Sequence, residues 1–236
     1  MTDERSPGGS AIYRHQQAAP HTGGVAHAND QRITEHLRGA HGGESMVFHE
    51  LVSDRVHLDV HVIYPTAEQP YYLLCTSGVS ARPMNVPASV EGADSWRYAE
   101  LCMLLPPNWT PTQEAFRDER VYWPVRLLKT LGRIPHEFDS WLGWGHSIPN
   151  GDPPAPYAPD TQLCGAVLIP PFLIGDSLFV AQGEPPLHVF QVLPITAAEM
   201  SFKLQVGLDG LLDRLESAIS DKVLYGPVDP LRPSVV

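Results

Sequence analysis

The sequence predicts an α+β fold: a mixed, mainly antiparallel β-sheet with helices packed on it. The first observation is a strict alternation of apolar and polar residues along His57–Tyr64, followed after a turn by the apolar run Tyr71–Thr76, which is the pattern of a β-hairpin. The second is a series of further short apolar runs, separated by turns rich in proline and glycine. The third is that the helical patterns stand apart from these runs, as is typical of an α+β arrangement.

The chain begins with a segment that has scarcely any periodic apolar position. Residues 1–30 consist largely of small and polar residues, so we expect a flexible N-terminal tail. A helix is predicted from Asp30, because the apolar residues that follow share one face and the pair Gly42-Gly43 ends it. A short strand is expected at Met46–Glu50.

The hairpin carries the most regular polar pattern of the chain. In its first strand, apolar side chains point to one face of the sheet, while His57, Asp59 and His61 point to the other. The next strand, Arg97–Leu105, is nearly continuous in apolar residues, as in a central strand covered on both faces. Glu100 interrupts it, and a buried carboxylate must find a partner or lose its charge.

A helix and a structured loop are predicted in the middle of the chain. Pro124 suits the first helical position, and Gly132 suits a left-handed residue at the C-terminal end. The residues between them are apolar on one side and mainly basic on the other. The loop that follows, up to Gly151, contains Trp141, Trp144 and several glycines with almost no charge, which indicates a packed loop.

The C-terminal half continues with strands and ends with helices. The expected strands are Cys164–Ile169, Ser177–Val180 and Leu187–Leu193. Thr196 and Glu199 have the spacing of a capping box that opens a helix, and leucines from Leu208 onward form the apolar face of a final one. Residues 226–236 are expected to form a C-terminal tail.

Four sequence blocks follow one another in a specific order. They are Asp59–Gly78 (Asp-Val-x-Val-Ile-Tyr-Pro-Thr-x-Glu-x-Pro-Tyr-Tyr), Tyr98–Trp109, Trp123–Gly151 (ending Trp-Leu-Gly-x-Gly-His-x-Ile-x-Asn-Gly) and Pro194–Glu199. In this order they resemble the Suppressor of fused domain, known in an animal signalling regulator and in many bacterial proteins; the resemblance covers roughly residues 31 to 220. It implies one domain at residues 31–225, with a fold like that of the family's N-terminal domain.

The resemblance implies a non-enzymatic protein-binding domain. In animal members of the family, the segment after the central helix helps to form the groove for a transcription-factor peptide, which points to Ile134, Trp141 and His146 in this sequence. Trp144 joins them, because tryptophan is enriched at the energetic centres of interfaces. The alternative is that Trp141 and Trp144 both close the edge of the core. The stand-alone bacterial members imply an immunity protein that neutralises a toxin by binding it.

Composition limits the partners and the compartment. The net charge of −11 argues against nucleic acid or an anionic membrane as partner, and favours a basic protein such as a basic toxin domain. No apolar run reaches the length of about 18 residues that a membrane span needs, and the N-terminus lacks a secretory pattern, so a cytoplasmic location is expected. Cys75, Cys102 and Cys164 lie in apolar runs without paired spacing and are expected to be reduced. No cofactor is expected, because neither a P-loop nor a G-x-G-x-x-G motif is present.

Two other functions stay open. His57, Asp59 and His61 project from one face of a strand and can hold a zinc ion if another element, such as His146, supplies a closing ligand. This arrangement would suit a metal-dependent hydrolase, although a solvated polar face of a hairpin produces the same alternation. The other alternative is an intracellular regulator that sequesters a transcription factor. A serine hydrolase is not indicated, because the G-x-S-x-G elbow is absent.

Overall fold

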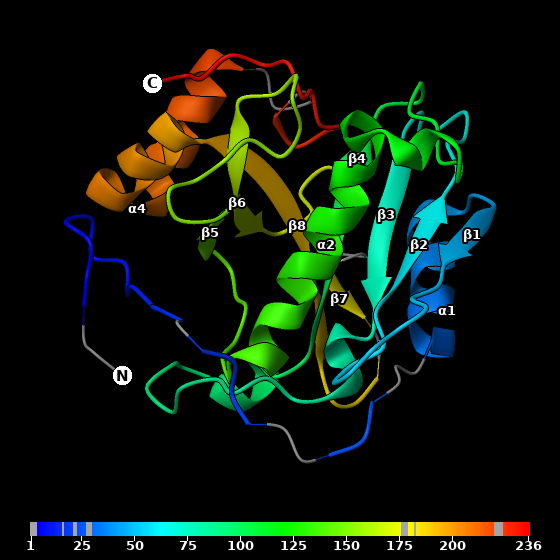
Figure 1. Cartoon of the computed structure of the whole chain (residues 1–236), viewed down its shortest axis with the longest axis horizontal. Coiled ribbons are helices and arrows are strands. Elements are labelled where there is room, and N and C mark those ends of the chain that lie inside the picture. Colours follow the sequence, from blue (N-terminus) through cyan, green and yellow to red (C-terminus); the bar gives the residue numbers. More distant parts are fainter. Residues whose placement is uncertain are drawn as a thin grey trace.

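The computed structural model describes residues 4–15, 17–20, 23–26, 30–175, 179–181, 183–219 and 224–236 of the chain. Its centre is one sheet with the strand order β1-β2-β3-β4-β8-β6-β5, to which β7 adds by pairing with β8 (Figure 1). The strands are β1 (Ser45–Phe48), β2 (Asp59–Ile63), β3 (Tyr72–Ser77), β4 (Ala99–Leu105), β5 (Ser147–Pro149), β6 (Leu163–Ile169), β7 (Val180–Ala181) and β8 (Leu187–Thr196). β4 and β8 run parallel and the other pairs are antiparallel, which confirms the predicted mixed, mainly antiparallel α+β fold.

Helices cover both faces of this sheet (Figure 1). They are α1 (Asp30–His41), α2 (Glu119–Glu137) and α4 (Ala197–Ala218), accompanied by short 3₁₀ turns at Val79–Ala81, Ala93–Trp96 and Ala115–Arg117. α2 packs on one face, while α1 and α4 pack on the other face toward its two ends. Among the helices of the described residues, none is both long and apolar enough to span a bilayer.

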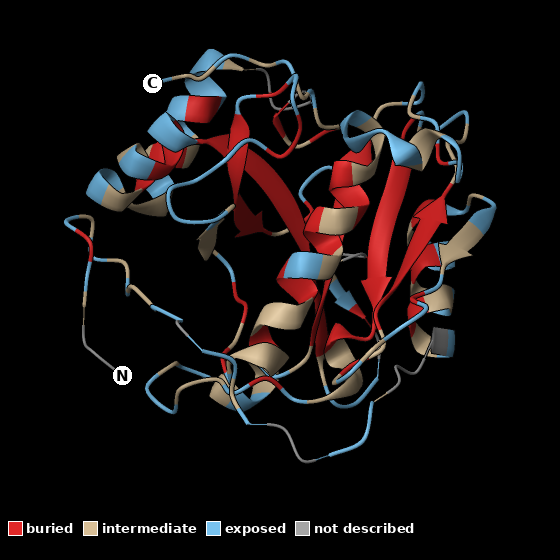
Figure 2. Ribbon diagram, viewed as in Figure 1, coloured by how far each residue is buried: buried red, intermediate tan, exposed pale blue. Residues whose placement is uncertain are grey.

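The alternation along β8 shows how the sheet separates these layers. Phe190 and Val192 belong to the core cluster beneath α2, whereas Val189 belongs to the cluster beneath α1. Leu193 and Ile195 belong to the cluster beneath α4. The strands between the helices are therefore buried on both faces, as Figure 2 shows by their continuous red colour, and this confirms the prediction of a covered central strand.

α2 begins earlier than the sequence predicted. Its first residue is Glu119, because Asp118 caps the helix by accepting a hydrogen bond from the Arg120 N–H at 2.9 Å. Pro124, the predicted first helical residue, therefore lies inside the helix. The prediction placed Pro124 first because proline prefers the first helical position. The capping residue Asp118, which lies upstream, sets the start instead.

α2 also ends later than predicted, at Glu137. Gly132 is not the C-terminal residue but a contact point: a Cβ at this position would lie 2.8 Å from Val79 Cγ2, so glycine allows the helix to approach the chain that follows β3. The left-handed position after the helix is taken by Asp139, with a φ of 49°. A short polar side chain tolerates this conformation better than most residues do.

The C-terminal helix confirms the predicted capping box. Thr196 Oγ1 accepts a hydrogen bond from the Glu199 N–H at 3.3 Å, and Glu199 Oε2 accepts one from the Thr196 N–H at 2.8 Å. Gly207 has a non-helical backbone with a φ of 89°, so α4 consists of two helical stretches, as predicted. The strand predicted at Ser177–Val180 lies partly outside the described residues. In the described part, β7 consists of Val180–Ala181.

The N-terminal segment passes α4 and the C-terminal end of α2 before the chain enters α1 (Figure 1). The Gly8 N–H donates to Leu204 O at 2.9 Å, and the Ala19 N–H donates to Glu137 O at 2.5 Å. Ala26 forms a parallel bridge with the chain just before β2. This segment therefore lies on the same side of the molecule as the loop after α2.

Candidate functional site

The loop from Ser140 to Ser147 leads from α2 to β5 and carries the aromatic residues predicted to bind a partner. Its backbone is held against β6. The Gly145 N–H donates to Leu168 O at 2.8 Å, and the Leu168 N–H donates to His146 O at 2.9 Å. These paired bonds extend the pairing of β5 with β6 into the loop and fix its course.

Lys203 of α4 holds the same loop through a buried ammonium group. Its Nζ donates to Gly145 O at 2.6 Å and to Ser147 Oγ at 3.1 Å. Burial lowers the pKa of Lys203, and the two acceptors provide compensating hydrogen bonds for its charged form. The loop is thus anchored from two elements, β6 and α4.

The two tryptophans of the loop have different surroundings. Trp141 is half-buried, folds over Gly143 and meets His146 edge-on, with ring centroids 4.3 Å apart. It also packs against the core cluster beneath α2. Trp144, in contrast, is 53% exposed. Trp141 therefore supports the loop from inside, while Trp144 presents a large aromatic surface to solvent.

Ile134 and His146 lie closer to the interior than Trp144. Ile134 is half-buried and packs against the core beneath α2. Burial and the nearby Lys203 charge lower the pKa of His146 to about 4, so its imidazole is neutral at physiological pH. The N-terminal segment reaches this region, because the Tyr13 and His146 ring centroids lie 6.2 Å apart. A partner of the loop would meet that segment as well.

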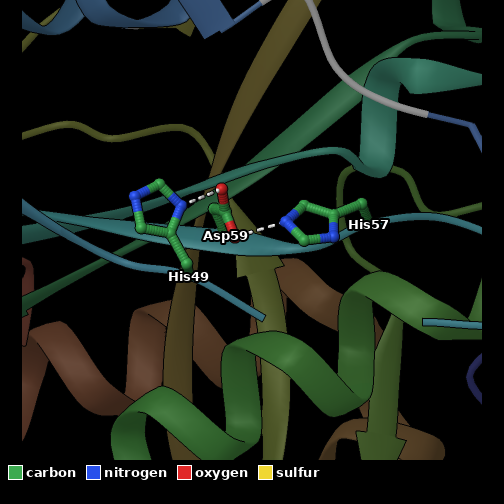
Figure 3. A group of neighbouring side chains, drawn as sticks. All are labelled: His49, His57 and Asp59. Carbon is green, nitrogen blue, oxygen red and sulfur yellow. Dashed lines mark hydrogen bonds and ion pairs between the residues drawn. The ribbon is translucent and has the colours of Figure 1, made fainter. Parts of the chain in front are cut away.

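A second polar group lies toward the opposite edge of the sheet, where β2 begins (Figure 3). His49 Nδ1 is 2.8 Å from one oxygen of the Asp59 carboxylate, Oδ2, and His57 Nε2 is 3.0 Å from the other, Oδ1. Oδ1 also accepts the Glu50 N–H at 2.8 Å. One ligand atom from each of the three side chains lies within 4.8 Å of the other two. We name His49, His57 and Asp59 the His-Asp-His cluster.

His61 does not belong to this cluster. It shares a face of β2 with Asp59, as the alternation predicted, but its Nε2 lies 2.9 Å from Ser77 Oγ. His146, the predicted closing ligand, contacts Trp141 instead. The alternative of a solvated hairpin face does not hold either, because Asp59 and His61 are both buried.

His49 is the member of the cluster that sequence reasoning missed. In the β1–β2 pair, Phe48 lies opposite Val60. Continuing this antiparallel register by one residue brings His49 beside Asp59. The signal therefore existed in the pairing of two strands, but alternation within one strand does not reveal it.

Several charged groups surround Asp59. Burial would raise the pKa of its carboxyl, but the Glu50 N–H, the hydrogen bond to His49 and the charge of His57 outweigh burial and lower the pKa. Glu50 itself pairs with Arg133 of α2. Lys129 is also within electrostatic range of Asp59 and Glu50, although burial lowers the pKa of its ammonium.

Ser77 and His61 are the residue types of a catalytic nucleophile and its general base, and they lie within hydrogen-bond distance. Both side chains are buried in adjacent strands of the sheet, so a substrate has no access to the Ser77 hydroxyl. We therefore interpret the pair as a hydrogen bond that satisfies two buried polar groups.

The fold and these sites define a mixed-sheet α+β domain with an exposed tryptophan on one anchored loop and a histidine cluster near one sheet edge. A profile of the family described as Suppressor of fused protein (SUFU) matches residues 54–230, which is about three quarters of the chain. The chain belongs to the Suppressor of fused family. A search of curated proteins gave no match.

Solved structures with the same fold include three from this family. A suppressor of fused protein homolog from Neisseria gonorrhoeae has a TM-score of 0.60 and 18% identity, covering 87% of this chain and 96% of its own. The Sufu–Fu complex has a TM-score of 0.60 and 14% identity, covering 88% and 92%. Drosophila Suppressor of Fused has a TM-score of 0.60 and 14% identity over 89% of this chain, which spans about half (52%) of the Drosophila chain. At these identities the likeness concerns the fold.

Proposed function

We propose that this chain is a protein-binding domain that recognises a basic partner through the loop around Trp144, and that it is a bacterial immunity protein that neutralises a toxin by binding it. The observation that carries the proposal is the 53% exposed Trp144 side chain on an anchored loop. Exposed tryptophans are frequent energetic centres of interfaces, and an anchored loop loses little conformational entropy on binding. In this proposal Trp141 and His146 support the loop from inside, and the half-buried Ile134 of α2 is a further candidate contact.

Charge supports a basic partner. The chain has a net charge of −11. The exposed Asp139 and Asp152 lie before and after the loop from Ser140 to Ser147, which we name the aromatic loop. An acidic surface steers a basic protein toward it and accelerates association at low salt. A basic toxin domain has this chemistry, and raising the ionic strength is expected to slow its association.

The relatives support protein binding in general. One of the solved structures with this fold is described as the Sufu–Fu complex. The toxin as partner follows from the resemblance to the stand-alone bacterial members of the family. It is the more specific part of the proposal and needs its own test.

The test combines affinity capture with calorimetry. The chain is used as bait in an extract of its source organism, and a captured toxin domain is then purified and titrated with wild type and with Trp144→Ala. We expect Trp144→Ala to weaken binding roughly thirtyfold, because truncation of a central tryptophan costs about 2 kcal/mol or more. Leu231→Ala is the matched control, because Leu231 is 69% exposed and lies in the C-terminal segment.

Two results would contradict the proposal. Capture that recovers no toxin domain would remove the immunity role. Equal affinities of wild type and Trp144→Ala would remove the aromatic loop as the binding surface.

A further inference from the structure

The hydrogen bonds around His57 leave its second ring nitrogen facing an acceptor. Ser53 Oγ is 2.5 Å from Glu50 Oε2, so the single hydroxyl proton lies between these two oxygens. Ser53 Oγ therefore accepts from His57 Nδ1 at 3.2 Å, and Nδ1 carries the proton. In a neutral imidazole, Nε2 then carries a lone pair, and this nitrogen lies 3.0 Å from Asp59 Oδ1, which is also an acceptor. Either a second proton or a cation must lie between the two acceptors.

The nearby side chains of Arg133 and Lys129 do not supply the positive charge between His57 Nε2 and Asp59 Oδ1. Arg133 pairs with Glu50, and within the described residues no ion pair joins Lys129 to Asp59. Among the described residues, the side chains in contact with the Asp59 carboxylate are thus the imidazoles of His49 and His57, and neither a guanidinium nor an ammonium group pairs with it. A buried carboxylate with this environment is suited to an exchangeable positive partner.

The cluster has the support that metal ligands require. The Glu50 N–H orients the Asp59 carboxylate, and Ser53 orients the His57 ring through the nitrogen that would not bind the metal. The Asp59 side chain is only 4% exposed, whereas that of His49 is 68% exposed. His49 can therefore turn toward an ion, and solvent can supply a further ligand from the same side.

We propose that His49, His57 and Asp59 bind one divalent ion of the zinc type at the start of β2 (Figure 3). Zinc binds nitrogen and carboxylate oxygen at about 2.0–2.2 Å, which places tetrahedral ligand atoms roughly 3.3 Å apart. The two imidazole nitrogens now face different oxygens of Asp59, at 2.8 and 3.0 Å, and one ligand atom from each residue lies within 4.8 Å of the other two. Binding an ion therefore requires the ligand atoms to approach one another by up to about 1.5 Å. Two imidazoles and one carboxylate select zinc over magnesium or calcium, which prefer oxygen ligands.

The ion acts as a clamp on the connection between β1 and β2. It joins His49, directly after β1, to Asp59, the first residue of β2. Leu51 and Val52 lie between them and are 95% and 85% exposed. Binding orders this connection and fixes its two apolar side chains at the surface. The inference is independent of the proposed function, since it concerns the other edge of the sheet.

The test uses the full chain without an affinity tag, stripped with a chelator and dialysed. Zinc is titrated in competition with a chromophoric chelator, and cobalt is added separately to read the coordination from its visible spectrum. We expect about one ion per chain, an intense tetrahedral cobalt spectrum and a higher thermal midpoint with zinc. Hydrogen exchange of the backbone between His49 and Asp59 is expected to slow when zinc is added.

Three single variants show whether these residues bind the ion. His49→Ala removes an exposed side chain and leaves the fold intact, and it is expected to weaken zinc binding at least about tenfold, as is His57→Ala. His15→Ala is the matched control, because His15 is exposed and lies in the N-terminal segment. The proposal is supported if His49→Ala and His57→Ala lose affinity while His15→Ala does not. It fails if wild type retains no zinc in competition, or if His49→Ala binds zinc as wild type does.

Discussion

Two buried carboxylates at different ends of the sheet are held by different kinds of partner. Glu199, near the start of α4, is fully buried and receives the Arg232 guanidinium at 2.6 and 2.7 Å. Asp59, at the start of β2, faces His49 and His57 at 2.8 and 3.0 Å. In both cases burial would raise the pKa of the carboxyl, and the partners outweigh burial and lower it.

The difference lies in the permanence of the positive charge. A guanidinium stays protonated at every pH at which the protein is folded, so Glu199 is permanently paired. This pair also joins the C-terminal segment to α4, because the Val235 N–H donates to Glu199 Oε1 at 3.2 Å. The imidazoles beside Asp59 have no such permanent charge, and a metal ion bound to their nitrogens would supply the positive charge. The Glu199–Arg232 pair is thus a permanent structural connection, and the surroundings of Asp59 are suited to a bound cation.

The largest effect is expected from Arg232→Ala. Removing one member of a buried pair leaves the other charge uncompensated, so we expect a loss of about 3–5 kcal/mol in the free energy of unfolding. Urea denaturation at neutral pH measures it. Arg120→Ala is the control, because Arg120 pairs with Asp118 in an exposed contact of 3.4 Å and should cost about 1 kcal/mol or less. Equal losses of unfolding free energy in the two variants would contradict the claim that the buried Arg232–Glu199 pair stabilises the fold more than an exposed pair.

Glu100 sharpens the comparison, because it is fully buried with neutral donors in place of a cation. Its Oε2 accepts from Thr76 Oγ1 at 2.6 Å. Its Oε1 accepts from the Gly78 N–H at 3.0 Å and from the Ser80 hydroxyl at 2.5 Å. Burial raises the pKa of Glu100 from 4.5 to about 7 despite these hydrogen bonds. The sequence-based expectation that this carboxylate needs partners or loses its charge is confirmed by these contacts.

The second prediction is a pH dependence that Glu100→Gln removes. The folded protein binds this proton more tightly than the unfolded chain, so stability is fully present below about pH 4.5 and is lost as the pH rises through about 7. We expect the wild type to lose about 2–3 kcal/mol across this interval relative to Glu100→Gln. Urea denaturation at a series of pH values measures the difference. Glu114→Gln, at an exposed position, controls for the loss of one negative charge. Parallel pH curves for wild type and Glu100→Gln would contradict the prediction.

The fold could be predicted because its signals are local. The alternation in β2, the apolar run of β4 and the capping box at Thr196 each depend on a few neighbouring residues. The start of α2 was wrong because the local capping signal of Asp118 was overlooked, and its end was wrong because it depends on a contact. Gly132 has the residue type of a helix end, but its lack of a side chain serves the approach of Val79.

The site was predicted only in part for a similar reason. Alternation places Asp59 and His61 on one face of a strand, but it does not say which residue of the neighbouring strand lies opposite. The register of β1 and β2, continued by one residue beyond Phe48, brings His49 to Asp59, and that of β2 and β3 places Cys75 opposite His61. The exposure of Trp144 and the partial burial of Trp141 likewise depend on how β6 and α4 hold the loop. These long-range contacts are not readable in a single stretch of sequence.

The smallest effect is expected from Asp59→Asn in the metal-free protein. Asparagine keeps an oxygen for the Glu50 N–H, but it loses the charge and places an NH2 donor where the second oxygen faces His49. His49 is exposed and can turn away, so we expect a loss of about 1 kcal/mol at neutral pH. Because the pKa of Asp59 is lowered in the folded protein, its advantage over asparagine is present above the ordinary value of 3.8 and disappears as the pH falls through the folded value. Urea denaturation with a chelator, at neutral and acidic pH, measures both. A loss as large as that of Arg232→Ala would show that Asp59 is itself a permanent structural connection, because an exchangeable partner contributes little to the fold when it is absent.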